Sequence, residues 1–341
     1  MNRAPVILFM LLLIPCIASA LPQDMIAPPV LFNLHPLYTA GAQPLCNPAQ
    51  TAGEGELIFK AAISYGNNYI VEGLQDDDTT IDLELDSEGV AADLSARIGL
   101  NNRSDFIVGL QASGQYGGVL DPIINGFHNL FGFPNGGREL RDPNETSFII
   151  YQDHQTILET DDHLGSLYMT LEPRLLLFRD KRVGRFFATM SLGLWSALPL
   201  FVPGHPLAAS KKESLKAGIR SYLAIETGPY FLQASGSLAG TSAPRFLDSE
   251  DLDALQFLFD FTIGRCFGEE VSAKCSVSGT TSPFHLGYER TDTFSAVFLL
   301  GGCLRTSPRD TLDFGFAEEF FTFAATDIGF HISWSHRTGG R

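Results

Sequence analysis

The sequence predicts an all-β fold, a transmembrane antiparallel β-barrel of about 12 strands in a bacterial outer membrane. Three observations predict it: apolar and polar residues alternate along many segments, these segments are about 10–15 residues long, and a secretory leader precedes them. Successive side chains of a strand point to opposite faces, so the alternation gives each segment one apolar and one polar face. A tilted strand of this length crosses a bilayer.

The leader comprises residues 1–20. Arg3 is its only charge before an apolar run from Val6 to Ile14, and Ala18-Ser19-Ala20 provides the small residues of a cleavage site. The apolar run is too short to span a bilayer as a helix. Pro15 before Cys16 does not fit a lipoprotein signal. We therefore expect a signal peptide that is removed after Ala20.

The net charge bears on the partners of the mature chain. The formal net charge is −16, and removing Arg3 with the leader leaves 22 basic and 39 acidic residues, or 22 − 39 = −17. Nucleic-acid binding needs a basic surface, so this class of partner is excluded. The partners that we expect are outer-membrane lipids, the barrel-assembly machinery and an unknown small solute.

Twelve alternating segments follow the leader, and the links between them alternate in length. The segments are residues 57–65, 90–98, 106–116, 164–178, 184–198, 213–225, 228–239, 252–265, 271–281, 292–305, 310–321 and 325–336. Short links (101–102, 179–183, 226–227, 266–270, 306–309) alternate with long ones (66–88, 117–163, 199–212, 240–251, 282–291). Outer-membrane barrels have short periplasmic turns and long outer loops, so both termini should be periplasmic.

The strand count depends on two ambiguous stretches. We treat residues 79–85 as an excursion of the first outer loop, because counting them as a strand gives an odd number. Fourteen strands result if part of 146–160 also crosses the membrane. A soluble sandwich is the alternative fold, but it would bury the apolar faces. Strand length, the leader and a strand close to the C-terminus favour the barrel.

These patterns divide the chain into a signal peptide (1–20), a lead-in segment (21–53), the barrel (54–337) and a short tail (338–341). The lead-in is rich in Pro, Ala and Gln and has no clear period. We interpret it as a periplasmic segment, with entry into the lumen as the second possibility.

The longest outer loop, residues 117–163, begins with a stretch that is not strand-like. It contains Gly117-Gly118, Asp121, Phe127-His128 and the run Pro134 to Arg138, followed by Tyr151-Gln152 and acids through Asp162. In these features the chain resembles a bacterial envelope family known as domain of unknown function 3187. The resemblance implies an envelope protein with a barrel, and it implies no reaction. The chain departs from the family after Trp334, where members usually end on an aromatic residue.

The same loop predicts a short helix. Asp121 is placed to cap a helix that begins near Pro122, and Gly132 can end it. The helix either folds into the barrel mouth or the membrane interface as a structural element, or acts as a gate or a platform for an apolar ligand. Arg138 could bind an anionic head group or a neighbouring acid. The candidate residues of this loop are Asp121, Phe127, His128, Phe131, Pro134, Asn135, Gly136, Gly137 and Arg138.

Charged residues also occur on the predicted lumen faces. They are Lys60, Arg97, Glu172, Arg174, Lys216, Arg220 and Asp260, and Asp93, Asp105 and Arg265 lie on the same faces. Such charges either select ions in a pore or form a ladder of internal ion pairs in a closed barrel.

The cysteines suggest a disulfide and no metal site. Cys46 in the lead-in could reach Cys266 or Cys303 near the periplasmic end, whereas the spacings fit no zinc pattern. We expect no metal and no cofactor. His128, His154 and His163 offer residue types found in barrel hydrolases, but no G-x-S-x-G motif is present, so an enzyme is the less favoured interpretation.

The sequence thus favours a porin-like channel or transporter, gated and specific for a small solute, with apolar compounds as one option. The second hypothesis is a non-conducting envelope barrel that serves as an interaction or structural protein. A lipid hydrolase of the outer membrane is the third.

Overall fold

The computed structural model describes residues 21–39, 41–76, 79–131, 146–152, 155–160, 165–201, 215–241, 255–282, 292–319 and 326–339. The predicted signal peptide lies outside these residues, as do Pro134, Asn135, Gly136, Gly137 and Arg138 of the candidate gate loop, and His154 and His163.

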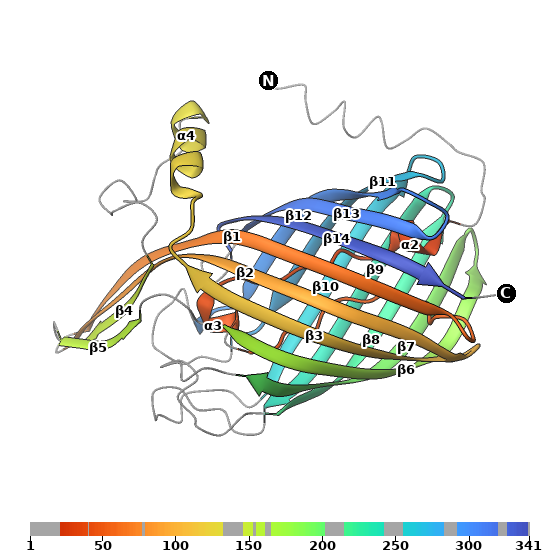
Figure 1. The fold of residues 1–341 in the computed structure, drawn as a ribbon, viewed down its shortest axis with the longest axis horizontal. Coiled ribbons are helices and arrows are strands. Elements are labelled where there is room, and N and C mark those ends of the chain that lie inside the picture. The colour runs from red at the N-terminus through yellow and green to blue at the C-terminus, as the bar shows by residue number, and fades with distance from the viewer. Residues whose placement is uncertain are drawn as a thin grey trace.

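The strands form a closed antiparallel barrel (Figure 1). The sheet has 14 strands, and two of them, β4 and β5, lie outside the ring, which leaves 12. Pairing of β1 with β14, from Leu57 opposite Thr338 to Asn67 opposite Ile328, closes the ring. The predicted fold and the count of 12 are therefore confirmed. No helix in the described residues is long and apolar enough to cross a membrane.

The ring strands are β1 (Leu57–Asp76), β2 (Thr79–Asn101), β3 (Ser104–Tyr116), β6 (Ser166–Val183), β7 (Phe186–Phe201), β8 (Lys216–Thr227), β9 (Tyr230–Thr241), β10 (Leu255–Cys266), β11 (Val271–Thr280), β12 (Ser295–Arg305), β13 (Asp310–Glu319) and β14 (Ile328–Thr338).

The period of two decides which side chains face outward. The outward face carries an apolar belt of exposed side chains, as a surface in contact with lipid requires. It includes Phe59, Ile63, Leu94, Ile98, Leu110, Leu194, Ile219, Leu238, Phe257, Phe261, Ile263, Leu300, Phe314, Phe330, Ile332 and Trp334. The opposite face of the same strands carries buried polar residues, so the lumen wall is polar.

The short turns lie together at the end of the barrel that holds both ends of the described chain. They link the strands at 102–103, 184–185, 228–229, 267–270 and 306–309. Gly184 and Gly228 have φ values of 62° and 57°, a left-handed conformation that glycine adopts without a steric cost. By the rule for outer-membrane barrels this end faces the periplasm.

The first outer link differs from the prediction. Residues 66–88 are not an open loop, because β1 and β2 continue to pair through this stretch, up to Asp76 opposite Thr79. A second hairpin, β4 (Ser147–Gln152) and β5 (Gln155–Thr160), pairs with the same extension of β2 at Ile81–Asp86. Residues 146–160 therefore extend the sheet beyond the barrel and do not add transmembrane strands.

The lead-in lies inside the barrel rather than in the periplasm. We call residues 21–53 the luminal segment. Its outgoing limb (21–35) contains α2 (Gln23–Ile26) at the short-turn end, and α3 (Pro36–Thr39) joins it near the opposite end to the returning limb (41–53) (Figure 1). Clusters of buried apolar side chains form where each limb meets the wall, as at Met25, Leu31 and Ala42.

Candidate functional site

The filled lumen is the candidate site, and the predicted lumen charges lie in it. Arg174, Arg220, Glu172 and Asp260 are buried, and Lys60, Arg97 and Lys216 are half-buried on the same inward face. Several of the cations among them contact main-chain carbonyl oxygens of the luminal segment, as the following contacts show.

The returning limb is held by two arginines that share one carboxylate, an arrangement that we call the arginine clamp. Arg174 on β6 binds Asp105 on β3 through Nε (2.9 Å) and Nη2 (2.7 Å), and Arg97 on β2 binds the same carboxylate. Arg174 Nη1 then donates to the carbonyl of Pro48 at 2.7 Å, and both guanidiniums donate to that of Gln50. A guanidinium held by a bidentate carboxylate keeps its remaining donors in a fixed direction.

Asp105 also accepts a hydrogen bond from the segment itself. The main-chain N–H of Ala52 donates to Asp105 Oδ2 at 2.8 Å. The clamp therefore binds the returning limb through both carbonyl and N–H groups. Asp105 is the residue that binds Arg97, Arg174 and Ala52 together.

A second anchor holds the returning limb on β8 to β10. Arg220 pairs with Asp260 and donates to the carbonyl of Leu45, while Ser235 donates to Asp260 at 2.7 Å. The guanidinium Cζ atoms of Arg174 and Arg220 lie 5.2 and 5.3 Å from the centre of the Tyr222 ring. These contacts tie the second anchor to the arginine clamp.

The outgoing limb has fewer charged contacts. Lys274 on β11 binds Asp313 on β13 at 2.8 Å and donates to the carbonyl of Ala27 at 2.6 Å. Ser272 donates to the carbonyl of Met25 at 2.8 Å. Asp24 pairs with Arg337, whose side chain is about one-third exposed, so solvent screens that pair.

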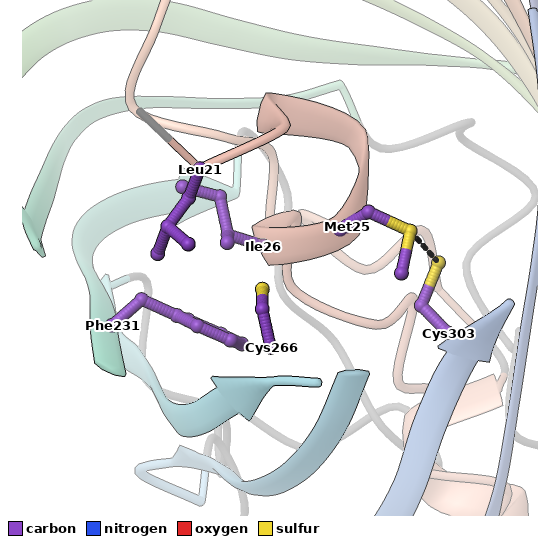
Figure 2. Close-up of a cluster of buried hydrophobic side chains, with 6 residues drawn as sticks. All are labelled: Leu21, Met25, Ile26, Phe231, Cys266 and Cys303. Carbon is purple, nitrogen blue, oxygen red and sulfur yellow. Dashed lines mark hydrogen bonds between the residues drawn. The ribbon is translucent and has the colours of Figure 1, made fainter. Parts of the chain in front are cut away.

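Apolar contacts hold the start of the outgoing limb. Figure 2 shows Leu21, Met25 and Ile26 packed on wall residues Phe231, Cys266 and Cys303. Met25 and Ile26 are fully buried, and Met25 Sδ lies 3.8 Å from Cys303 Sγ. We call this group the entrance cluster.

The predicted disulfide between Cys46 and Cys266 or Cys303 is not formed. All four cysteines of the described chain are free thiols. Cys46 lies on the returning limb with its Sγ 3.5 Å from Ser235 Oγ, whereas Cys266 and Cys303 belong to the entrance cluster. The prediction was wrong because the lead-in folds back through the lumen, which places Cys46 against β9.

The two limbs leave little space beside the charges. A cavity of about 20 Å³ lies between Val30, Leu45 and the wall residues Lys60, Asp93 and Glu172. This is room for one or two water molecules. With the luminal segment seated, this cavity is too small for a solute larger than water.

At the outer turn of the luminal segment, His35 is fully buried. Its ring lies 6.1 Å from that of Tyr38. His35 belongs to the luminal segment rather than to a strand, and burial lowers its pKa to about 3 because a charged imidazolium would lose its hydration.

The predicted helix is present as α4 (Asp121–Phe131), but it does not cover the mouth (Figure 1). Leu120, rather than Asp121, takes the cap position, because its carbonyl accepts the hydrogen bond of Ile124. Glu88 accepts from the Leu120 N–H, and Asn67 donates to Asp121 at 3.5 Å. The side chains of Phe127, His128 and Phe131 lie outside the described residues.

Glu88 and Asn67 show on which side of the wall α4 docks. The two residues are directly opposite each other in the β1–β2 pair. On β1, Asn67 lies on the same face as the exposed Phe59 and Ile63, whereas Lys60 and Ser64 lie on the inward face. The helix therefore begins on the outward face of the barrel.

Sequence reasoning missed Lys274 and Asp313 as a luminal pair, although both lie on the polar face of alternating strands. It also missed the acceptors in the luminal segment. These are main-chain carbonyls, which every residue type supplies, so no sequence motif marks them.

The family described as "Protein of unknown function (DUF3187)" matches residues 8–170, just under half of the chain. The resemblance seen in the 117–163 loop is thereby confirmed. A comparison with curated protein sequences gave no match.

Among solved structures, the chain is similar to the COG4313 outer membrane channel from Pseudomonas putida F1. The TM-score is 0.53 at 9% identity, with 87% of this chain and 100% of that chain covered. Outer membrane phospholipase A from Escherichia coli gives a TM-score of 0.38 at 8% identity, over 82% and 92% of the two chains. The translocator domain of the autotransporter NalP from Neisseria meningitidis gives 0.38 at 6%, over 85% and 91%. The channel shares the barrel fold with this chain.

Proposed function

We propose that the protein is a channel of the bacterial outer membrane for small solutes, and that residues 21–53 close its pore. One observation carries this proposal: charged side chains of the lumen wall bind main-chain groups of a separate segment. A barrel sealed by its own side chains would need no such segment. Removing the segment would leave these donors to water, as in a water-filled pore.

The size of the luminal segment supports a pore that a solute can enter. Two passes of the chain lie side by side in the lumen between α2 and Gly53. Extended chains pack about 5 Å apart in one direction and about 10 Å in the other, so two passes fill a cross-section of roughly 10 Å. A pore of this width admits small hydrated molecules and excludes folded proteins.

The lumen wall favours a polar solute. It carries Arg97, Asp105, Arg174, Arg220 and Asp260, which would line the open pore. An apolar solute would have to strip water from these groups without replacing their hydrogen bonds. We therefore propose a small polar or charged solute in place of the apolar option.

Targeting belongs to the same proposal. A cleaved leader would deliver the chain to the envelope, the barrel-assembly machinery would insert it, and the apolar belt would contact outer-membrane lipids. The hydrolase hypothesis depended on His128, His154 and His163, whose side chains lie outside the described residues, and it stays a hypothesis.

Planar-bilayer recording tests the proposal. The refolded mature chain should be mostly silent, and a variant lacking residues 21–50 should conduct continuously, with steps expected of a pore of roughly 10 Å. Heat-dependent migration on a gel verifies that both samples contain folded barrel. A folded deletion variant that stays silent would contradict the proposal and favour the non-conducting interaction barrel.

A further inference from the structure

Helix α4 is fixed to the barrel at its first turn, and Gly126, Asn129 and Leu130 farther along it are exposed. Leu120, Asp121 and Ile124 are buried, and Glu88 and Asn67 hold this turn against the outward face of β1 and β2. Figure 1 shows α4 extending away from the barrel wall, across the direction in which the strands run.

The docking point lies at the edge of the apolar belt. On β1 the outward residues Phe59, Ile63 and Tyr65 precede Asn67, and Tyr116 on β3 is paired with Glu88. The rings of Tyr65 and Tyr116 stack with their centres 6.0 Å apart. Tyrosines mark the membrane–water interface of outer-membrane barrels, so α4 starts at the level of the lipid head groups.

The free part of α4 exposes large apolar side chains. Ile123 is 62% exposed and Leu130 is 78% exposed, and residues seven apart share a helix face. Val119, just before the helix, is 64% exposed. Asn129 is also exposed but lies about 100° around the helix from Leu130. The helix is thus amphipathic, with one apolar side that the barrel does not cover.

We infer that α4 is an interfacial helix that buries Ile123 and Leu130 in the outer leaflet of the membrane. Lipid is the occupant because the exposed face continues the apolar belt at the same level, on the side of the wall that already faces lipid. A helix that lies in the interface plane with its apolar side toward the acyl chains has this arrangement of residues. The outer leaflet follows from the position of α4 at the end opposite the short turns.

Fluorescence of a single environment-sensitive label tests this inference. The label is attached to Ile123→Cys or Leu130→Cys, and Asn129→Cys is the matched control on the same helix. Cys275→Ser removes the half-buried native thiol, since Cys46, Cys266 and Cys303 are buried. The proteins are refolded into vesicles of phosphatidylcholine and phosphatidylglycerol, with or without nitroxide-labelled acyl chains.

We expect the labels at positions 123 and 130 to emit at shorter wavelength and to be quenched by the acyl-chain nitroxide. The label at 129 should instead be quenched by aqueous iodide. Equal iodide quenching at all three positions would overturn the inference, because the helix would then lie in water. A blue-shifted label that lipid nitroxide does not quench would also overturn it, since protein would cover the face. Two reporter positions keep the test valid if one variant fails to refold.

Discussion

The two limbs of the luminal segment are held in different ways. The returning limb is bound by guanidinium groups that buried carboxylates fix in place, at Asp105 and Asp260. The outgoing limb is held by the entrance cluster, by Lys274 and by hydrogen bonds from uncharged side chains, such as Ser272 to the carbonyl of Met25 and Gln115 to that of Leu34. Apolar contacts are not directional, whereas the clamp loses several hydrogen bonds at once if its geometry changes. The returning limb also continues directly into β1.

Under the proposed channel function, this difference predicts which limb would move when the pore opens. The outgoing limb begins, in the expected mature chain, at a free end beside the entrance cluster. It can leave without disturbing the arginine clamp, so it is the part that we expect to be released first. The following variants act on each limb separately.

Loss of the clamp should have the largest effect. In Asp105→Asn, Arg97 and Arg174 both lose their charged partner, and breaking a buried ion pair in this way costs about 3–5 kcal/mol. We expect a lower temperature of barrel unfolding and frequent pore openings in bilayers. Glu318→Gln is the control, because it neutralises an exposed carboxylate on β13 that does not touch the segment. Unchanged stability and silent recordings would show that the clamp does not hold the returning limb.

Truncation in the entrance cluster should have the next largest effect. Met25→Ala removes a fully buried side chain, and such changes cost about 2–5 kcal/mol. We expect the substitution to weaken docking of the outgoing limb by this free energy. Pore openings should then increase, while the unfolding temperature of the barrel should change little. Met190→Ala, a half-buried site on the outward face of β7, is the matched control. An equal rise in openings in both variants would contradict the assignment.

Acidification by one pH unit, from 6.5 to 5.5, should have the smallest effect. The pKa of His35 falls from 6.5 to about 3 in the docked segment, so the released segment takes up a proton first as the pH falls. Its contribution to docking is fully present above pH 6.5 and is lost progressively toward pH 3, by at most ~1.4 kcal/mol per pH unit. Openings of the wild-type protein should increase when the pH is lowered from 6.5 to 5.5. The pH dependence should be weaker in His35→Gln, and an identical profile would contradict the role of His35.

The sequence was sufficient to predict the barrel, because alternation along a strand reports directly which residues face lipid and which face the lumen. It placed Arg174 and Arg220 on the inward face for the same reason. For residues 21–53 the sequence supported entry into the lumen only as the second possibility, since Pro, Ala and Gln without a period specify neither strand nor helix. Its contacts use main-chain groups, and these leave no trace in residue type.

Two further differences have a similar cause. The alternation of Ile81, Leu83 and Leu85 with acidic residues indicates a strand. It does not show that this part of the strand lies beyond the membrane, because the length of a hairpin there is not limited by bilayer thickness. The helix of the outer loop followed from its own residues. Its position followed from Asn67 and Glu88, which are distant in sequence and lie on the outward face.

Cross-linking each limb in turn tests the central claim most directly. In a Cys266→Ser, Cys275→Ser background, Met25→Cys places a thiol beside Cys303, and Ser235→Cys places one beside Cys46. A short bifunctional thiol reagent then ties the outgoing or the returning limb to the wall. Openings are recorded in urea, below the concentration that unfolds the barrel, because urea weakens apolar contacts.

We predict that cross-linking at Met25→Cys abolishes the openings, whereas cross-linking at Ser235→Cys leaves them. Openings that persist with the outgoing limb tied, or that stop only when the returning limb is tied, would contradict the account.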